Sequence, residues 1–116
     1  MAAQQAKRHE LGRSGERYVK ANGIAKGKLT RHTAPFDVVD FNNRRAYEVK
    51  TMSALSKDLK IHIASHSWER KLDFASKYGL KMILLAVVIY SETEVEVYKS
   101  ELRQSVRVNQ MELIAQ

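Results

Sequence analysis

The segment PFDVVDFNNRRAYEVK, residues 35–50, decides the fold because it reads as two strands joined by a tight turn. The runs Phe36–Phe41 and Arg45–Lys50 are rich in the β-branched and aromatic residues that favour strands. Asn42 and Asn43 lie between the runs, and asparagine tolerates the left-handed backbone conformation that tight turns need. The segment therefore predicts a β-hairpin.

The register of this hairpin follows from the position of its turn. If the two asparagines form the turn, Phe41 pairs with Arg44, and the numbers of facing residues sum to 85. Asp37 then lies opposite Glu48, with their Cβ atoms about 4.5–5.5 Å apart on one face of the sheet. A longer loop centred on the same point keeps this register.

Lys50 joins these two acids, because side chains alternate along a strand and Glu48 and Lys50 therefore share a face. Opposed carboxylates cost free energy unless a cation compensates them. Hard carboxylate oxygens suit Mg²⁺ or Mn²⁺, and such an ion polarises a phosphate oxygen and acidifies a bound water. Lys50 can orient that water or neutralise charge that develops on the phosphate. The alternative is a solvent-facing patch of salt bridges among the same three residues.

Helices and strands are predicted on both sides of the hairpin. We expect a helix over about Gln4–Asn22, a short strand over Lys28–Thr33, a loop over Thr51–Lys60, a short strand over Lys60–Ala64, a helix capped by Ser65 or Ser67 that runs to Tyr78, a buried strand over Met82–Tyr90 and a half-buried strand over Glu94–Tyr98. The last residues, 99–116, are ambiguous. A helix that leads into a fully apolar strand is typical of an α/β fold, with a mixed central sheet flanked by helices.

The two helices carry further signals. Gly12 and Gly15 cost the first helix about 1 kcal/mol each relative to alanine, so they indicate either the close approach of a backbone or ligand, or a helix that begins later. In the second helix, an apolar face is predicted and Gly79 is expected to end the helix. The residues of that face are Trp68, Leu72, Ala75 and Tyr78.

The composition indicates a single basic domain, residues 1–116. Lys and Arg number 20 against 13 Asp and Glu, a formal net charge of +7, which favours binding to nucleic acid or to an anionic membrane surface. The chain has no cysteine, which excludes disulfides, thiolate chemistry and cysteine-based zinc sites. It has no secretory leader pattern, and its longest apolar run, Met82–Tyr90, is shorter than the ~20 residues of a membrane span. We expect an intracellular protein, cytoplasmic or nucleoid-associated.

The order of the chemical residues resembles a known signature. Pro35-Phe36-Asp37, followed by Glu48-Val49-Lys50, is similar to the PD-(D/E)XK nuclease motif, with one residue inserted between Pro and Asp. Glu16 matches the glutamate that this superfamily often carries in its first helix. From about Gly12 to Tyr98 the layout resembles archaeal-type Holliday junction resolvases in particular. That layout consists of Glu48–Thr51, Ile61–Ile63, a helix that ends in Phe74–Gly79, and the apolar strand Met82–Val88.

This resemblance implies a restriction-endonuclease-like αβββαβ core and DNA as the substrate, with branched or junction DNA as the specific candidate. It implies that Asp37 and Glu48 bind Mg²⁺ or Mn²⁺, that Glu16 supports the metal shell, and that Lys50 assists the attacking water. A homodimer is expected too, since two symmetric strands must be cut; the strand Glu94–Tyr98 or the C-terminal segment is the candidate interface.

Resolvases of this type often carry a hydroxyl residue upstream of the aspartate, for which the candidates are Thr30 and Thr33. Basic side chains near the site are candidates for phosphate contacts. Those we select for DNA contact are Arg13, Arg17, Lys28 and Arg31, together with Thr30.

Four other residues are weighed against more ordinary roles. Asp40 is an odd number of positions from Asp37, so we expect it on the other face, exposed or paired. Trp68 is expected in the core rather than stacked on a base. His62 and His66 have i, i+4 spacing, but His62 is predicted on a strand, so the spacing does not predict a metal site.

Three functions are compatible with these patterns. The first is a metal-dependent DNA endonuclease. The second is a non-catalytic basic module that binds nucleic acid, whose affinity would depend on salt but not on metal. The third is a partner-binding domain in which the acids form salt bridges.

Overall fold

The hairpin of residues 35–50 is present in the computed structural model, which describes residues 14–30, 34–54 and 59–116. Strand β2 (Val38–Asp40) pairs antiparallel with β3 (Arg45–Met52), and facing residue numbers sum to 85, as for Val38 opposite Tyr47. The predicted register is confirmed.

The turn of this hairpin is longer than two residues. It spans residues 41–44, and Arg44 rather than an asparagine adopts the left-handed conformation, with φ 55°. Asp40 is buried and accepts hydrogen bonds from the backbone N–H (3.1 Å) and the side-chain amide (2.7 Å) of Asn43. These bonds hold the pKa of Asp40 below its usual value. Asp40 is thus a paired, turn-stabilising residue, as expected.

The central sheet is mixed, as predicted, and has six strands. Their order is β1 (Lys28–Leu29), β2, β3, β5 (Lys81–Ile89), β6 (Val95–Glu101) and β8 (Glu112–Ala115). Strands β3 and β5 run parallel, and every other neighbouring pair is antiparallel. Because β8 pairs with the outer edge of β6, the sheet edge on that side belongs to β8.

A second, two-stranded sheet corrects the prediction for residues 60–64. The strand there is shorter, β4 (Lys60–His62), and it pairs with β7 (Ser105–Arg107) instead of joining the central sheet. The ambiguous C-terminal residues supply β7, the 3₁₀ helix η1 (Val108–Gln110) and β8. The three strands that precede α2 in the central sheet are therefore β1, β2 and β3, and β4 is not among them.

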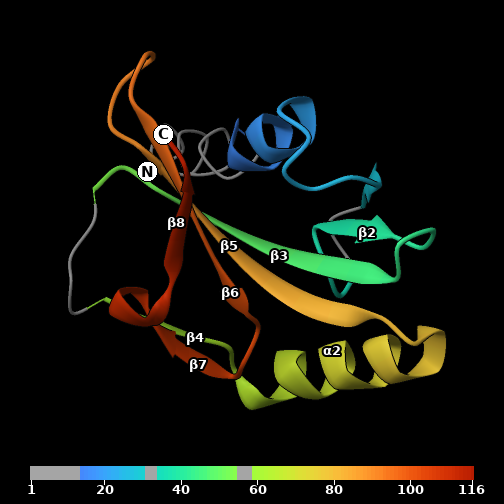
Figure 1. Cartoon of the computed structure of the whole chain (residues 1–116). Coiled ribbons are helices and arrows are strands. Elements are labelled where there is room, and N and C mark those ends of the chain that lie inside the picture. The colour runs from blue at the N-terminus through green and yellow to red at the C-terminus, as the bar shows by residue number, and fades with distance from the viewer. Residues whose placement is uncertain (1–13, 31–33, 55–58) are drawn as a thin grey trace, which may run out of the picture.

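The two helices cover opposite faces of the central sheet (Figure 1). The first helix occupies residues 14–21 of the described chain, and its Val19 packs in one apolar cluster with Tyr47 and Leu85. The other helix, α2 (Ser65–Tyr78), contributes Ala75 to the cluster on the opposite face. After its first residue, Lys81, strand β5 is continuously apolar because it is covered on both sides. No helix in the described part of the chain is long and apolar enough to cross a membrane.

The ends of α2 were predicted in part. Gly79 ends the helix in the left-handed conformation, with φ 62°, as expected. The predicted serine cap is wrong: Ala64 is the N-cap residue, it makes no side-chain capping bond, and Ser65 is already the first helical residue.

The buried face of α2 also differs from the predicted one. Leu72 and Tyr78 are each 41% exposed, whereas Lys71 and Ala75 are buried. The spacing of apolar residues predicted the wrong buried face, because the centre of the actual buried face is a lysine, Lys71.

Gly15 permits the first helix to lie directly against β3. A Cβ atom at this position would lie 1.9 Å from Oγ1, 3.0 Å from Cβ and 3.1 Å from Cγ2 of Thr51. The close neighbour at this glycine is thus the side chain of Thr51, whereas a backbone or a ligand was predicted. Gly12 lies outside the described residues.

We expect Gly15→Ala to lower the free energy of unfolding by about 1–3 kcal/mol, because overpacking outweighs the gain in helix propensity of roughly 1 kcal/mol. Urea denaturation measures the change. Thr51→Ala removes two of the three close atoms, so in a double-mutant cycle it should reduce the cost of Gly15→Ala. A Gly15→Ala variant as stable as the parent would contradict the packing described.

Candidate active site

Asp37 is held against β3 from the position immediately before β2. Its backbone N–H donates to the carbonyl of Tyr47 (3.0 Å), and its Oδ2 accepts from the backbone N–H of Val49 (2.7 Å). Thr30 fixes the other side: its N–H donates to the Asp37 carbonyl (3.0 Å), and its hydroxyl donates to the carbonyls of Phe36 and Asp37. The structure therefore places Thr30 as a residue that positions the Asp37 segment.

Glu48, in β3, is only 8% exposed and lies between two lysines. Its Oε2 is 2.5 Å from Nζ of Lys71, and its Oε1 is 3.5 Å from Nζ of Lys50. The Lys71 ammonium also donates to the carbonyl of Pro35 and lies 4.8 Å from the ring centre of Phe36. The Lys71 side chain is 9% exposed and that of Lys50 is 45% exposed. One ammonium is thus built into the core, and the other is open to a ligand.

The pKa of the Asp37 carboxyl is raised by burial and by neighbouring acids. Its pKa is raised to about 7, by burial as the largest cause and by the carboxylates of Glu48 and Glu16 as smaller ones. The Val49 hydrogen bond and the Lys71 charge act in the opposite direction. The structure thus brings Asp37, Glu48 and Lys50 together and places Glu16, on the first helix, within electrostatic reach of Asp37.

The donor chemistry of these acids fits a hard divalent cation, because an ion between like-charged carboxylates would relieve their repulsion. The side chains are nevertheless engaged elsewhere. The carboxylate oxygens of Glu48 face two ammonium groups, and Asp37 faces a backbone N–H. Accordingly, the described residues contain no group of three or more His, Cys, Asp or Glu side chains arranged to hold a metal.

The raised pKa of Asp37 predicts how the metal-free protein responds to pH. Between about pH 4 and 7 the folded protein keeps a proton on Asp37 that the unfolded chain releases. The free energy of unfolding should therefore fall as the pH rises through this range, by up to about 4 kcal/mol. Urea denaturation in EDTA at several pH values measures the slope. Asp37→Asn, which retains an acceptor for the Val49 N–H, should flatten it. An unchanged slope in Asp37→Asn would show that Asp37 does not titrate in this way.

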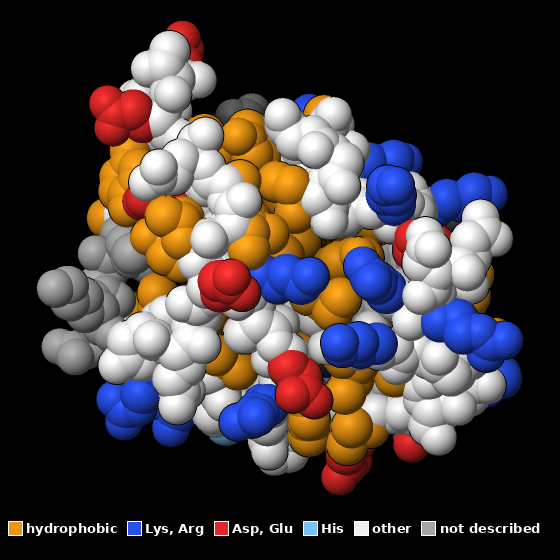
Figure 2. All heavy atoms as spheres, in the orientation of Figure 1, with side chains coloured by type: hydrophobic (Ala, Val, Ile, Leu, Met, Phe, Trp, Pro, Cys, Tyr) orange, Lys and Arg blue, Asp and Glu red, His pale blue; other side chains and the backbone are white. Residues whose placement is uncertain are grey.

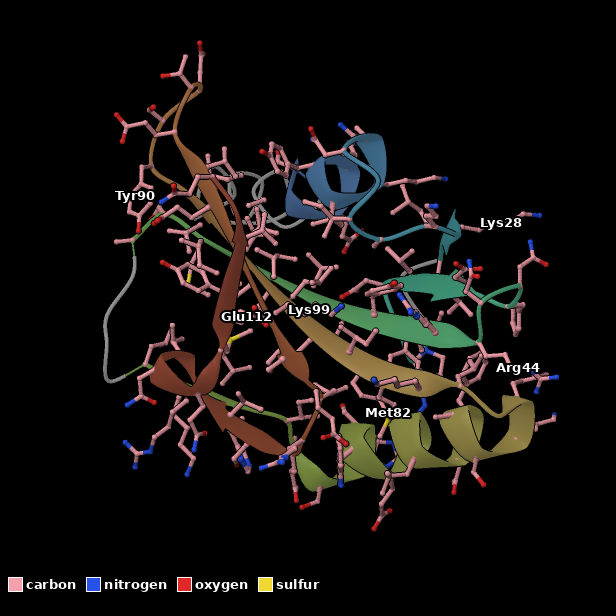
Figure 3. The ribbon with its side chains drawn as sticks, viewed as in Figure 1. Lys28, Arg44, Met82, Tyr90, Lys99 and Glu112 are labelled. Carbon is pink, nitrogen blue, oxygen red and sulfur yellow. The ribbon has the colours of Figure 1, made fainter. Side chains whose placement is uncertain are left out.

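The remaining predicted site residues lie on the periphery. Arg17 and Lys28 are exposed, and Lys28 lies on the edge strand β1 (Figure 3). Arg13, Arg31 and Thr33 lie outside the described residues.

The ordinary roles expected for Trp68 and His62 fit the structure. Trp68 packs against the core beneath α2. His62 lies on β4, where its Nδ1 is 2.6 Å from the hydroxyl of Ser105. His66 belongs to α2, so the two histidines do not share a helix face.

Lys71 is the site residue that the sequence did not predict. It lies three positions after Trp68 and four before Ala75, so helical spacing alone places it on the buried face of α2. A single charged residue at the centre of an apolar helix face was the available signal, because a buried lysine needs an anionic partner.

No match to the chain was found among protein-family models, curated proteins or solved structures. The resemblance to PD-(D/E)XK nucleases therefore stays a prediction.

Proposed function

We propose that this chain is a metal-dependent endonuclease that hydrolyses DNA phosphodiester bonds at Asp37, Glu48 and Lys50. The observation that carries the proposal is the proximity of half-buried Asp37 to buried Glu48, where burial and the Glu48 carboxylate raise the pKa of Asp37 to about 7, with the exposed amine of Lys50 beside Glu48. Carboxylates held close together, with a raised pKa as the result, are typical of functional sites.

Asp37 and Glu48, supported by Glu16, would hold Mg²⁺ or Mn²⁺, and the bound ion would supply Lewis acidity and a nucleophilic water at neutral pH. The protein groups have separate tasks. The Val49 N–H orients the carboxylate of Asp37. The Lys71 ammonium, which solvent scarcely reaches, orients Glu48 and is a positioning residue.

Lys50 is the cation that a substrate can reach. Its ammonium contacts Glu48 on one side and is open on the other, so it can hold a phosphate oxygen or the attacking water next to the acids. Lys50 lies two residues beyond Glu48 on β3, so the alternation of the strand places both side chains on the same face of the sheet.

The charge of the protein suits a polyanionic substrate. Figure 2 shows lysine and arginine side chains gathered over one half of the visible face, with fewer acids among them. With a net charge of +7, binding to DNA should weaken steeply as salt increases.

The finer parts of the proposal come from the resolvase resemblance. They are the restriction-endonuclease-like core, branched DNA as substrate and a two-fold dimer that acts near the nucleoid. Since β8 covers the outer edge of β6, a dimer contact through that edge of the sheet would involve β8 rather than the strand predicted over residues 94–98.

The test is a cleavage assay with branched, single-stranded and duplex DNA, each with Mg²⁺, Mn²⁺ or EDTA. We expect cleavage only with metal and its loss in Asp37→Asn. Cleavage that survives Asp37→Asn, or intact substrate under every condition, would contradict the proposal.

A second candidate is a non-catalytic module that binds nucleic acid. It is favoured by the two ammonium groups that already neutralise Glu48 and by the missing ligand cluster among the described residues. It predicts salt-dependent DNA binding that is indifferent to metal and unaffected by Lys50→Met apart from the loss of one charge.

A further inference from the structure

An exposed pair of aromatic rings lies where the hairpin turn meets the C-terminal end of α2. Phe41, in the turn, is 56% exposed, and Tyr78, the last residue of α2, is 41% exposed. Their ring centres are 5.4 Å apart in an edge-to-face arrangement. The ring of Phe74 supports both, at 4.8 Å from Tyr78 and 6.5 Å from Phe41. We call Phe41 and Tyr78 the aromatic platform.

Two basic side chains, Lys77 and Arg44, lie near this platform. Nζ of Lys77 lies 5.4 Å from the ring centre of Tyr78. The guanidinium of Arg44 lies over Gly79, where a Cβ would be 3.2 Å from its Nη1, and the Arg44 carbonyl accepts from the N–H of Lys81 (2.8 Å). Figure 3 shows Arg44 at this end of the hairpin, beside the end of α2. Cations beside exposed rings suit an occupant that combines negative charge with flat apolar faces.

The backbone conformation of Arg44 supports a role for this residue in binding. Its φ of 55° is a conformation that glycine or asparagine adopts at lower cost. The turn nevertheless places an arginine there, and the effect is to hold a guanidinium over the end of α2. Unfavourable backbone conformations of this kind often occur at binding sites.

The platform is connected to the candidate active site by direct contacts. The Phe74 ring lies 5.9 Å from the ring of Phe36, the residue before Asp37. Phe36 in turn lies under the Lys71 ammonium that holds Glu48. A chain of packed side chains therefore joins the platform to the candidate active site.

We propose that Phe41 and Tyr78 stack on unpaired bases of a DNA strand whose phosphates Arg44 and Lys77 hold. The proposal rests on the proposed function and narrows its substrate class to DNA with a single-stranded segment next to the cleaved bond. An unpaired strand offers base faces and phosphates together, which matches the rings and the cations. A duplex hides its base faces within the stack, so the rings would find no contact there.

The test is the binding of a labelled single-stranded oligothymidylate and of a duplex of equal length, measured by fluorescence anisotropy in EDTA. We expect Phe41→Ala and Tyr78→Ala each to weaken single-strand binding about 5- to 100-fold, and duplex binding by less than about twofold. Tyr78→Phe keeps the ring and should bind as the parent does. Leu72→Ala is the matched control, because Leu72 is equally exposed (41%) on the same helix but lies outside the platform. Thermal melts confirm that each variant is folded.

A parent protein that does not bind the single strand would overturn the stacking proposal, as would ring removals that change its affinity by less than about twofold. Equal losses for single strand and duplex would overturn it too, since they indicate a general effect on the basic surface. Because these measurements exclude metal, their outcome is independent of catalysis. Ring-dependent binding without metal-dependent cleavage would contradict the nuclease proposal alone, and cleavage with ring-independent binding would contradict stacking alone.

Discussion

Lys50→Met is expected to lower the rate of metal-dependent DNA cleavage by at least about 100-fold while the protein stays folded. The Lys50 ammonium is the solvent-accessible cation beside Glu48, and its removal withdraws positive charge from the place where a phosphate would acquire negative charge. The pair Lys50–Glu48 is exposed at the lysine, so its loss should change stability by less than about 1 kcal/mol. Initial rates at saturating Mn²⁺, together with urea denaturation, separate the two effects.

Lys99→Met is the matched control for this substitution. Lys99 lies on β6 opposite Glu112, so the variant loses one positive charge from the same sheet (Figure 3). Its cleavage rate should stay within about twofold of the parent, because Lys99 lies on β6, separated by β5 from the strand that carries Glu48, and a single charge there affects mainly salt-dependent binding. Equal rates for Lys50→Met and Lys99→Met would exclude Lys50 from the chemistry.

Lys71→Met is expected to destabilise the protein by about 3–5 kcal/mol. The substitution removes the ammonium 2.5 Å from Glu48 and leaves a buried carboxylate that, among the described residues, keeps its ion pair with Lys50. It also removes the donor to the Pro35 carbonyl. Urea denaturation at pH 7.5 measures the loss.

Two comparisons distinguish this effect from a general loss of charge on α2. Lys77→Met, at an exposed position of the same helix, should cost less than about 1 kcal/mol. Glu48→Gln combined with Lys71→Met should cost less than the sum of the two single changes, because the buried charge is then absent. A Lys71→Met variant as stable as the parent would show that the ion pair does not hold the site together.

The hairpin and its acids could be predicted because both depend on local rules. The centre of the turn fixes the register, and the alternation of side chains along a strand then places Asp37, Glu48 and Lys50 together. The continuous apolar run in β5, Met82 to Ile89, could be predicted equally well, since the part of a strand that is covered on both faces is apolar.

Contacts between distant segments could not be predicted in this way. Lys71 reaches Glu48 across 23 positions, and a single lysine in a helix does not reveal its partner. The hydroxyl of Thr30, a candidate for DNA contact, donates to the carbonyls of Phe36 and Asp37, and a linear pattern cannot show these bonds. Strand β8 was missed because an exposed edge strand lacks the alternation that identifies a half-buried one.

Manganese soaked into crystals of the protein, located by anomalous scattering, tests the central claim most directly. We expect one strong peak in contact with carboxylate oxygens of both Asp37 and Glu48, and its loss in Asp37→Asn. If manganese occupies other positions while Glu48 stays bound to Lys71 and Lys50, the acids serve structure rather than catalysis.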